Sequence, residues 1–269
     1  MVKIKSNYFN KKLIIISGAN SGIGSEIAKQ FLKYDVELVL LNKNLKINNS
    51  LQDNINNSNA KVEIFSCDFN DFYNSEELVK KIEKKFKKKI DIFINCVGYN
   101  IIGYCEDIPD KDLKNIMNVN FFTPQKIVTS IIKSNKDKFT QFVFIDSNSS
   151  KKGLPANSAY CSSKAAMSVF TESLRNENKY VNILSVFPGL VDTKFGVKSL
   201  NFSNLKNTFF YGRKIQPTYL SILIIKAIIL RKNYLRFSFV NILAISFSYI
   251  MPDIFDNIIK KKFRKLNGL

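Results

Sequence analysis

The stretch Leu13-Ile14-Ile15-Ile16-Ser17-Gly18-Ala19-Asn20-Ser21-Gly22-Ile23-Gly24 decides the fold of this chain. Its first four residues form a continuous apolar run, which is typical of a strand buried on both faces of a parallel sheet. An amphipathic pattern then continues to about Tyr34 and predicts a helix. The glycines between strand and helix let backbone N–H groups approach an anion, and the positive end of the helix favours the same anion. The turn therefore indicates a site for the phosphates of a dinucleotide.

The same alternation of apolar strands and amphipathic helices continues along the chain. Further strands are predicted at 36–41, 62–65, 90–94, 142–145 and 181–187, with a seventh at 235–240. Helices are predicted at 76–88, 110–134, 157–178 and 217–231. Six to seven strands alternating with helices indicate an α/β fold, a doubly wound parallel sheet of the Rossmann type with helices on both faces.

The composition bounds the class of protein. The chain has 269 residues, of which 45% are hydrophobic, so we expect a single domain over 1–269. Lys and Arg exceed Asp and Glu by 41 to 22, but the charge is spread along the sequence. We therefore do not expect a nucleic-acid partner.

Several reaction classes are excluded or disfavoured by residue content. The chain has no His, which excludes every His-based mechanism. Its four cysteines form no C-x-x-C pair, so neither a metal site nor a disulfide framework is expected. The polar N-terminal residues leading into the first strand show no signal peptide, and we expect a cytoplasmic protein.

A second motif, Tyr160-Cys161-Ser162-Ser163-Lys164, lies in the helix predicted at 157–178. Residues four apart share a helix face, so Lys164 would place its ammonium beside the Tyr160 phenol. A nearby cation favours the phenolate and would lower the pKa of Tyr160 from its ordinary value of about 10. Ser147 adds a hydroxyl at the end of the strand at 142–145. These three side chains predict a proton-donating site, and the alternative is an exposed helical pair.

Other polar residues follow the predicted strands. Lys43 follows the second strand, where no acid is present, and a basic residue there suits the 2′-phosphate of NADP; a generic charged loop is the alternative. Asp68, Asn95 and Pro188-Gly189 follow later strands. The carboxyl ends of parallel strands meet at one edge, where such sheets bind ligands. Asn120, with Pro124 shortly after it, interrupts the helix at 110–134 and indicates a functional kink.

Taken together, these motifs resemble those of the short-chain dehydrogenase/reductase family, in its short single-domain branch. The matching segments run in order from Leu13 to about Phe195. They are Ser17 to Gly24 for the TGxxxGxG loop, Cys67-Asp68 for the acid beside the adenine, Asn95-Cys96-Val97-Gly98 for NNAG, Asn120 for the helix asparagine, Ser147 for the serine, Tyr160 to Lys164 for YxxxK and Pro188 to Thr193 for PGxVxT. Three departures stand out: Ser17 replaces Thr, Cys96-Val97 replaces Asn-Ala, and Asn42 leaves the coenzyme choice open.

The resemblance implies an NAD(P)-dependent oxidoreductase that moves a hydride between nicotinamide and a carbonyl or secondary alcohol. Tyr160 would be the general acid/base, Lys164 would hold the nicotinamide ribose, Ser147 would bind the substrate oxygen, and Asn120 would hold a water linking Lys164 to solvent. NADP, with NAD as the alternative, would be bound by Ser17, Gly18, Asn20, Ser21, Gly22, Ile23, Gly24, Lys43, Asp68, Phe69, Asn95, Val97, Gly98, Tyr160, Lys164, Pro188, Gly189, Val191 and Thr193. The resemblance also implies a homodimer or homotetramer.

The C-terminal third contains no reaction motif. The resemblance implies a substrate lid at 190–216. Residues 239–251 are almost entirely apolar and a basic cluster follows at 260–265, but the run is shorter than the ~20 residues that a bilayer span needs. We expect the extension at 239–269 to pack on the core or on a partner subunit. The alternative is peripheral contact with an anionic membrane, which would make the protein membrane-associated.

Three functions stay open at this point. The first is a reductase for a lipid-like or 3-oxoacyl substrate. The second is a sugar-modifying reductase of a surface-polysaccharide pathway. The third is a non-catalytic dinucleotide-binding protein, whose usual signature is loss of one of the reactive side chains; Ser147, Tyr160 and Lys164 are all present here.

Overall fold

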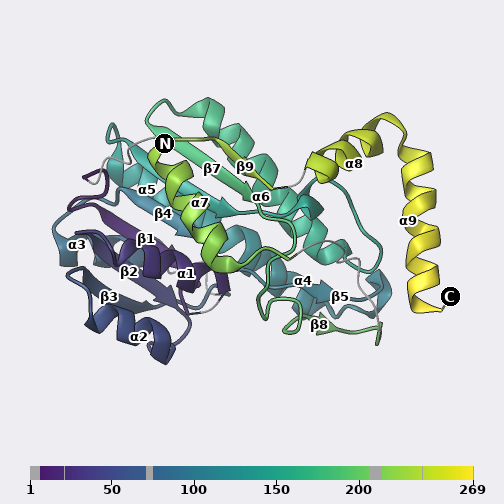
Figure 1. Ribbon diagram of the computed structural model, residues 1–269, viewed down its shortest axis with the longest axis horizontal. Coiled ribbons are helices and arrows are strands. Elements are labelled where there is room, and N and C mark those ends of the chain that lie inside the picture. Colours follow the sequence, from purple (N-terminus) through teal and green to yellow (C-terminus); the bar gives the residue numbers. More distant parts are fainter. Residues whose placement is uncertain (1–6, 21, 71–74, 206–213, 238, 269) are drawn as a thin grey trace.

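The computed structural model describes residues 7–20, 22–70, 75–205, 214–237 and 239–268 (Figure 1). Its main sheet has seven parallel strands in the order β3-β2-β1-β4-β6-β7-β9. They are β1 (Leu13–Ser17), β2 (Glu37–Asn42), β3 (Lys61–Ser66), β4 (Ile92–Asn95), β6 (Thr140–Ile145), β7 (Val181–Phe187) and β9 (Tyr234–Arg236). The doubly wound parallel sheet predicted from the sequence is confirmed.

Helices cover both faces of this sheet. They are α1 (Gly22–Phe31), α2 (Asn49–Asn56), α3 (Ser75–Phe86), α4 (Asp110–Met117), α5 (Thr123–Asn135), α6 (Ser158–Glu177) and α7 (Pro217–Ile229). Successive side chains of a strand point to opposite faces of the sheet, so β1 contributes to two hydrophobic cores. Ile14 and Ile16 pack with α1, α2 and α7, whereas Leu13 and Ile15 pack with α3, α5 and α6. The continuous apolar run in β1 is therefore explained by burial on both faces.

The carboxyl ends of the central strands meet at one edge. Ser17, the last residue of β1, is in register with Leu41 of β2 on one side and with Asn95 of β4 on the other. The order in which strands are added to the sheet switches sides between β1 and β4. β2 and β3 lie on one side of β1, and β4, β6, β7 and β9 lie on the other. Open α/β sheets bind ligands at such a switch point.

The helix predicted at 110–134 is interrupted. A π-helical turn, η3 (Asn118–Phe122), lies between α4 and α5 and contains Asn120. π-helical turns are rare and occur frequently at functional sites. The kink expected from Asn120 and Pro124 is present, with Pro124 in the first turn of α5, where its missing N–H costs little.

Two short elements were not predicted. β5 (Ile101–Ile102) and β8 (Leu200–Asn201) form a small parallel sheet apart from the main one. The 3₁₀ turns η2 (Cys105–Asp107) and η4 (Asn148–Ser150) follow β5 and β6. The small sheet ties the segment after β7 to the segment after β4.

The seventh strand is shorter than predicted. β9 ends at Arg236, and the residues from 239 onward are helical, as α8 (Phe239–Ile250) and α9 (Pro252–Asn267). Among the described residues, no single helix is both long and apolar enough to cross a bilayer; Val240–Ile250 and Pro252–Asn267 meet the criteria only jointly and are bent by 120°. Figure 1 shows α8 and α9 at one end of the molecule, near α4 and β5, with α3 and β3 at the other end.

Candidate active site

The glycine turn after β1 is closed too tightly to accept side chains. Gly18 and Gly22 have positive φ angles of 66° and 55°, which favour glycine. A Cβ placed on Gly24 would lie 2.3 Å from the carbonyl oxygen of Gly18, and one on Gly22 would lie 3.3 Å from Cγ2 of Thr193. The turn therefore leaves the backbone at the start of α1 uncovered by side chains of its own glycines, and Thr193 lies beside it. Ser21, predicted to bind the cofactor, lies outside the described residues.

Ser17 joins the ends of β1 and β4. Its buried hydroxyl donates a hydrogen bond to Oδ1 of Asn95 (2.8 Å) and accepts one from the N–H of Cys96 (3.1 Å). The hydroxyl that Ser17 shares with threonine is thus fully used within the protein. Ser17 and Asn95 fix the loop that contains Val97 and Gly98.

Asn20 connects the glycine turn to the loop before α2. Its Oδ1 accepts a hydrogen bond from the N–H of Asn48 (2.6 Å), and its Nδ2 donates to the carbonyl of Lys46 (3.0 Å). Ile23, the next predicted residue after the turn, packs against the core between α1 and α7. The side chains of Asn20 and Ile23 are therefore used to hold the turn against the rest of the protein.

Two predicted residues at the ends of β2 and β3 lie together. Lys43 Nζ is 3.0 Å from Asp68 Oδ2. The N–H of Asn70 and the Lys43 ammonium hold the pKa of Asp68 below its ordinary value. The Phe69 side chain is buried in the core, and its carbonyl accepts a hydrogen bond from Thr123 (2.6 Å). Lys43 and Asp68 therefore face the same region, whereas Phe69 anchors the loop.

Asn42 was not predicted as a site residue. It is the last residue of β2 and is 7% exposed, yet neither atom of its amide has a hydrogen-bond partner within the described structure. Buried polar groups without protein partners are uncommon, and a bound ligand or water is one way to satisfy them. Asn42 ends the same strand that Lys43 follows, so its position is the sequence signal that could have found it.

Three predicted catalytic side chains meet between β6 and α6. Tyr160 and Lys164 are each 6% exposed, and Lys164 Nζ is 6.0 Å from the centre of the Tyr160 ring. Lys164 donates a hydrogen bond to the carbonyl of Ile145 (2.8 Å), at the end of β6. The Ser147 side chain acts on the Tyr160 phenol, because it lowers the pKa of that group. The structure thus brings Ser147, Tyr160 and Lys164 together.

The pKa of Tyr160 is shifted upward. Burial raises it above the ordinary value, the hydrogen bond from Ser147 opposes this, and the Asp146 carboxylate adds to it. This is opposite to the lowering that we predicted from Lys164. The reason is that Tyr160 is buried and that the Lys164 ammonium bonds the Ile145 carbonyl. Burial also lowers the pKa of Lys164.

Asp146 is a buried acid that the sequence analysis missed. It is 5% exposed and accepts a hydrogen bond from the N–H of Ser147 (2.8 Å). Burial raises the pKa of Asp146 and Lys164 opposes that rise, while Asp146 raises the pKa of Lys164. Cys96 also lies near Lys164, and burial raises the pKa of its thiol to about 12. Asp146 directly precedes Ser147 at a strand end, which is the signal that could have found it.

Asn120 and Gly98 complete this cluster. Asn120 accepts a hydrogen bond from the N–H of Tyr99 (3.1 Å) and donates to the carbonyl of Tyr99 (3.0 Å) and to Ser163 (2.9 Å). A Cβ on Gly98 would lie 3.2 Å from Asn120 Oδ1 and 3.7 Å from Lys164 Nζ. The Asn120 side chain is therefore engaged with protein groups, and the predicted water would depend on its backbone in η3. That role stays a prediction.

The segment after β7 contacts both the glycine turn and the Tyr160 cluster. Gly189, after the buried Pro188, has a positive φ of 72°, and Val191 pairs with Ile215. Thr193 approaches Gly22, as described above, and the rings of Phe195 and Tyr160 lie 6.0 Å apart. The segment at 190–216, predicted to be a lid, therefore lies next to Tyr160. Its residues 206–213 lie outside the described residues.

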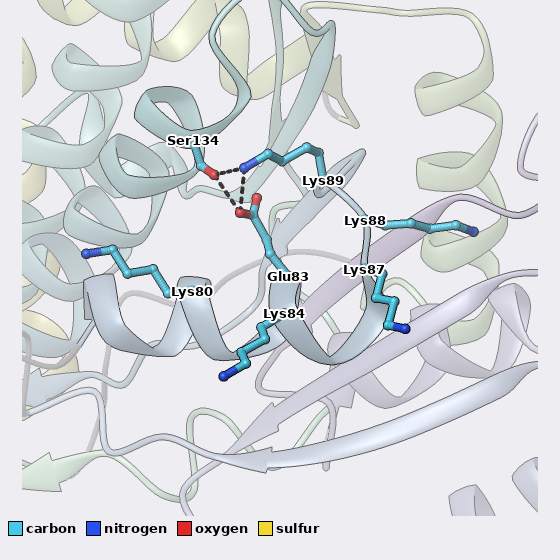
Figure 2. Close-up of a pocket in the computed structure, with 7 residues that line it drawn as sticks. All are labelled: Lys80, Glu83, Lys84, Lys87, Lys88, Lys89 and Ser134. Carbon is cyan, nitrogen blue, oxygen red and sulfur yellow. Dashed lines mark hydrogen bonds and ion pairs between the residues drawn. The ribbon is translucent and has the colours of Figure 1, made fainter.

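A lysine-lined hollow of about 450 Å³ belongs to a different part of the molecule (Figure 2). It is lined by Lys80, Glu83, Lys84, Lys87, Lys88, Lys89 and Ser134. Lys89 bonds Glu83 (2.9 Å) and Ser134, while Lys84 and Lys87 extend outward. Lys87 to Lys89 precede β4, so this hollow lies at the amino end of the strands, opposite the Tyr160 cluster.

Known proteins resemble this chain in sequence. The family model for short chain dehydrogenases matches residues 12–202. A 3-ketodihydrosphingosine reductase of Dictyostelium discoideum is 29% identical over 202 residues, covering 68% of this chain and 60% of the relative. A dehydrogenase/reductase SDR family member 7B of Mus musculus is 29% identical over 201 residues, covering 72% and 62%. The chain thus spans about 60% of the length of these relatives.

Solved structures share the fold. An alcohol dehydrogenase from Thermococcus sibiricus, complexed with 5-hydroxy-NADP, superposes with a TM-score of 0.73 at 20% identity, covering 85% of this chain and 96% of that one. A short chain dehydrogenase/reductase from Burkholderia phymatum, in complex with NAD, gives 0.77 at 18% identity and covers 91% and 95%. These likenesses show the Rossmann-type architecture. Because the family model matches well over half of the sequence, the chain belongs to the short chain dehydrogenase family.

Proposed function

We propose that this protein is an NADP(H)-dependent oxidoreductase that reduces a lipid-like ketone, or oxidises the corresponding secondary alcohol, with Tyr160 as general acid/base. The observation that carries the proposal is the meeting of Ser147, Tyr160 and Lys164 at the sheet edge that also holds the glycine turn. Ligands of doubly wound sheets bind at this edge.

The residues at the edge fit a dinucleotide. The glycine turn leaves backbone N–H groups at the start of α1 for the pyrophosphate. The unpartnered amide of Asn42 suits the hydroxyls of the adenosine ribose, and Lys43 suits a 2′-phosphate. Gly98 and Lys164 would hold the nicotinamide half. The bound coenzyme supplies or accepts the hydride.

The reactive side chains have complementary tasks. A tyrosine phenol is protonated at neutral pH, and burial keeps Tyr160 so, which lets it donate its Oη proton to the carbonyl oxygen as negative charge develops there. The Ser147 hydroxyl hydrogen-bonds the same oxygen and stabilises that charge. The positive charge of Lys164 stabilises the Tyr160 phenolate that remains after the proton is transferred. In the oxidising direction the same phenolate would accept the proton.

The substrate class rests on the relatives. Several of the curated relatives are 3-ketodihydrosphingosine reductases, from Dictyostelium discoideum, Bos taurus and Mus musculus. That name describes a long-chain ketone, and reduction of a ketone is the reaction that a proton-donating tyrosine supports. A long-chain ketone is therefore the first substrate to test.

Titration calorimetry with NADPH and NADH, followed by a ketone panel, tests the proposal. The panel contains 3-ketodihydrosphingosine, short water-soluble ketones and keto sugars. We expect tighter binding of NADPH than of NADH and consumption of NADPH with the long-chain ketone. Turnover of keto sugars alone would indicate the polysaccharide-pathway alternative. Coenzyme binding without turnover of any ketone would indicate a non-catalytic dinucleotide-binding protein.

A further inference from the structure

The C-terminal helix pair α8–α9 exposes a run of large apolar side chains. Val240, Leu243, Phe247 and Ile250 recur at intervals of three or four residues, so they form one stripe along α8, and they are 40–74% exposed. On α9 the stripe is followed by Ile254 and Ile258, which are 46% and 52% exposed. Contiguous exposed apolar side chains mark interaction surfaces.

The second half of α9 adds positive charge to this surface. Five basic residues occur within six positions, and all are exposed: Lys260, Lys261, Lys262, Arg264 and Lys265. Phe263, in their midst, is buried, and its ring packs edge to face against Tyr104, with 6.2 Å between the ring centres. This aromatic contact joins α9 to the body of the protein, and the basic side chains lie around it.

The helix pair is attached to segments that flank the catalytic cluster. Tyr249 donates a hydrogen bond to the carbonyl of Lys151 (2.6 Å), and Lys152 pairs with Asp256 (2.9 Å). Lys151 and Lys152 follow η4, which begins directly after Ser147. At the other side, a Cβ on Gly189 would lie 3.8 Å from Nδ2 of Asn241 in α8. The pair thus lies beside the loops that follow β6 and β7, at the end of the molecule that also holds α4 and β5 (Figure 1).

We propose that α8–α9 is a docking surface for an anionic membrane. The apolar stripe would enter the boundary between headgroups and acyl chains, and the basic cluster would bind the headgroups. Docking parallel to the membrane agrees with the 120° bend and with the charges on α9, which a spanning helix would have to bury. A second copy of this chain is disfavoured as the occupant, because the chain has a net charge of +19 and its basic cluster would face another positive protein.

Membrane docking has a consequence that rests on the proposed function. The helix pair contacts the loops after β6 and β7, so docking would place the cluster of Ser147, Tyr160 and Lys164 next to the lipid surface. A lipid-like ketone could then enter the site from the bilayer without crossing bulk water. Docking through α8–α9 would therefore suit the lipid-like substrate that we propose.

Vesicle flotation tests the docking surface without any need for turnover. The full chain is floated with phosphatidylcholine vesicles that contain or lack phosphatidylglycerol, at low and at high salt. We expect flotation with the anionic vesicles at low salt and a marked loss at high salt, because screening weakens headgroup binding. No flotation with anionic vesicles at low salt would overturn the proposal.

Matched variants separate the tail from general charge and hydrophobicity. Leu243→Glu/Ile250→Glu removes part of the stripe, and Leu230→Glu, at a residue 50% exposed after α7, is its control. Lys261→Glu/Lys265→Glu reverses part of the basic cluster, and Lys84→Glu/Lys87→Glu, at the hollow at the opposite end, makes the same charge change (Figure 2). We expect the tail variants to bind anionic vesicles at least tenfold more weakly, and the controls to bind like the unmodified chain. Equal losses in tail and control variants would contradict the proposal.

Two further measurements keep the outcome interpretable. NADPH binding and thermal unfolding of each variant report whether the body remains folded. Analytical ultracentrifugation reports whether the tail variants dissociate an oligomer; dissociation with unchanged flotation would mean that a second copy covers this face, and would overturn the proposal. Reduction of a water-soluble ketone, measured separately, shows whether the proposed activity fails on its own.

Discussion

The carboxyl edge of the sheet and the C-terminal helix pair depart from the usual distribution of side chains in opposite ways. The edge buries Tyr160, Lys164 and Asp146, whereas α8 exposes Val240 and Ile250. Polar groups are normally outside and large apolar ones inside. The buried groups at the edge bond the backbone around them, and the charges of Lys164 and Asp146 are opposite, so their burial is balanced within the protein. The apolar stripe of α8 has to be covered from outside, so it is a surface for a partner.

Replacing the proton donor should have the largest effect. We expect Tyr160→Phe to lower kcat by about 10²- to 10⁴-fold, because the transition state loses its general acid. NADPH affinity, measured by calorimetry, should stay close to that of the unmodified chain. Tyr219→Phe, at an exposed tyrosine in α7, is the control and should be without effect. Near-normal turnover in Tyr160→Phe would remove Tyr160 from the mechanism.

Closing the glycine turn should have the next largest effect. A Cβ at position 24 would lie 2.3 Å from a backbone oxygen, so Gly24→Ala must displace the turn. Overpacking of this kind costs about 1–3 kcal/mol, and we expect NADPH affinity to fall by a comparable amount, roughly 10- to 100-fold. Gly153→Ala, where nothing lies within 4 Å of the added Cβ, is the control. Equal NADPH affinity in both variants would contradict the assignment of the turn.

The fold could be predicted from the sequence because burial on two faces leaves a plain signal. β1, β2, β4, β6 and β7 contain apolar runs, whereas β3 alternates polar and apolar residues and is only half-buried. β5 and β8 were missed because two residues are too short to show a period. The helices α8 and α9 were not assigned, because an apolar run of about twelve residues is compatible with several structures until its surroundings are known.

The candidate site was predictable where chemistry depends on local spacing. Tyr160 and Lys164 are four residues apart on a helix, so their proximity follows from helix geometry. The direction of the Tyr160 pKa shift did not follow, because desolvation depends on the packing of Ile101, Ile116 and Ala159 around the ring. Asp146 and Asn42 stand at strand ends, which the sequence shows, but the burial of the acid and the missing partners of the amide depend on the packing around them.

Neutralising Asp146, the buried acid at the sheet edge, tests how its charge affects the pKa values of Tyr160 and Lys164. Asp146 raises the pKa of both Tyr160 and Lys164, so Asp146→Asn should lower both. Ketone reduction needs a protonated Tyr160 and declines as pH rises through the pKa of that group. We therefore expect this decline to begin at lower pH in Asp146→Asn, as read from the pH profile of kcat/KM. Asp35→Asn, in an exposed pair with Lys11, should leave the profile unchanged; a profile unchanged in both variants would contradict the assigned role of Asp146.

Removing Lys43 should have the smallest effect, because this side chain is exposed. We expect Lys43→Ala to weaken NADPH binding by roughly fivefold, equivalent to about 1 kcal/mol, and to leave NADH binding unchanged. Lys87→Ala, at the hollow on the opposite edge, is the control. Equal losses for NADPH and NADH would mean that Lys43 does not read the 2′-phosphate.

Transfer of deuterium from NADPH labelled at the nicotinamide C4 tests the central claim most directly. The purified chain is incubated with the labelled coenzyme and the ketone panel, and the alcohols are analysed by mass spectrometry and NMR. The account predicts deuterium on the carbon that was the carbonyl carbon, with transfer slowed by about 10²- to 10⁴-fold in Tyr160→Phe. Binding of NADPH by the unmodified chain, with no deuterium transferred to any ketone, would contradict it.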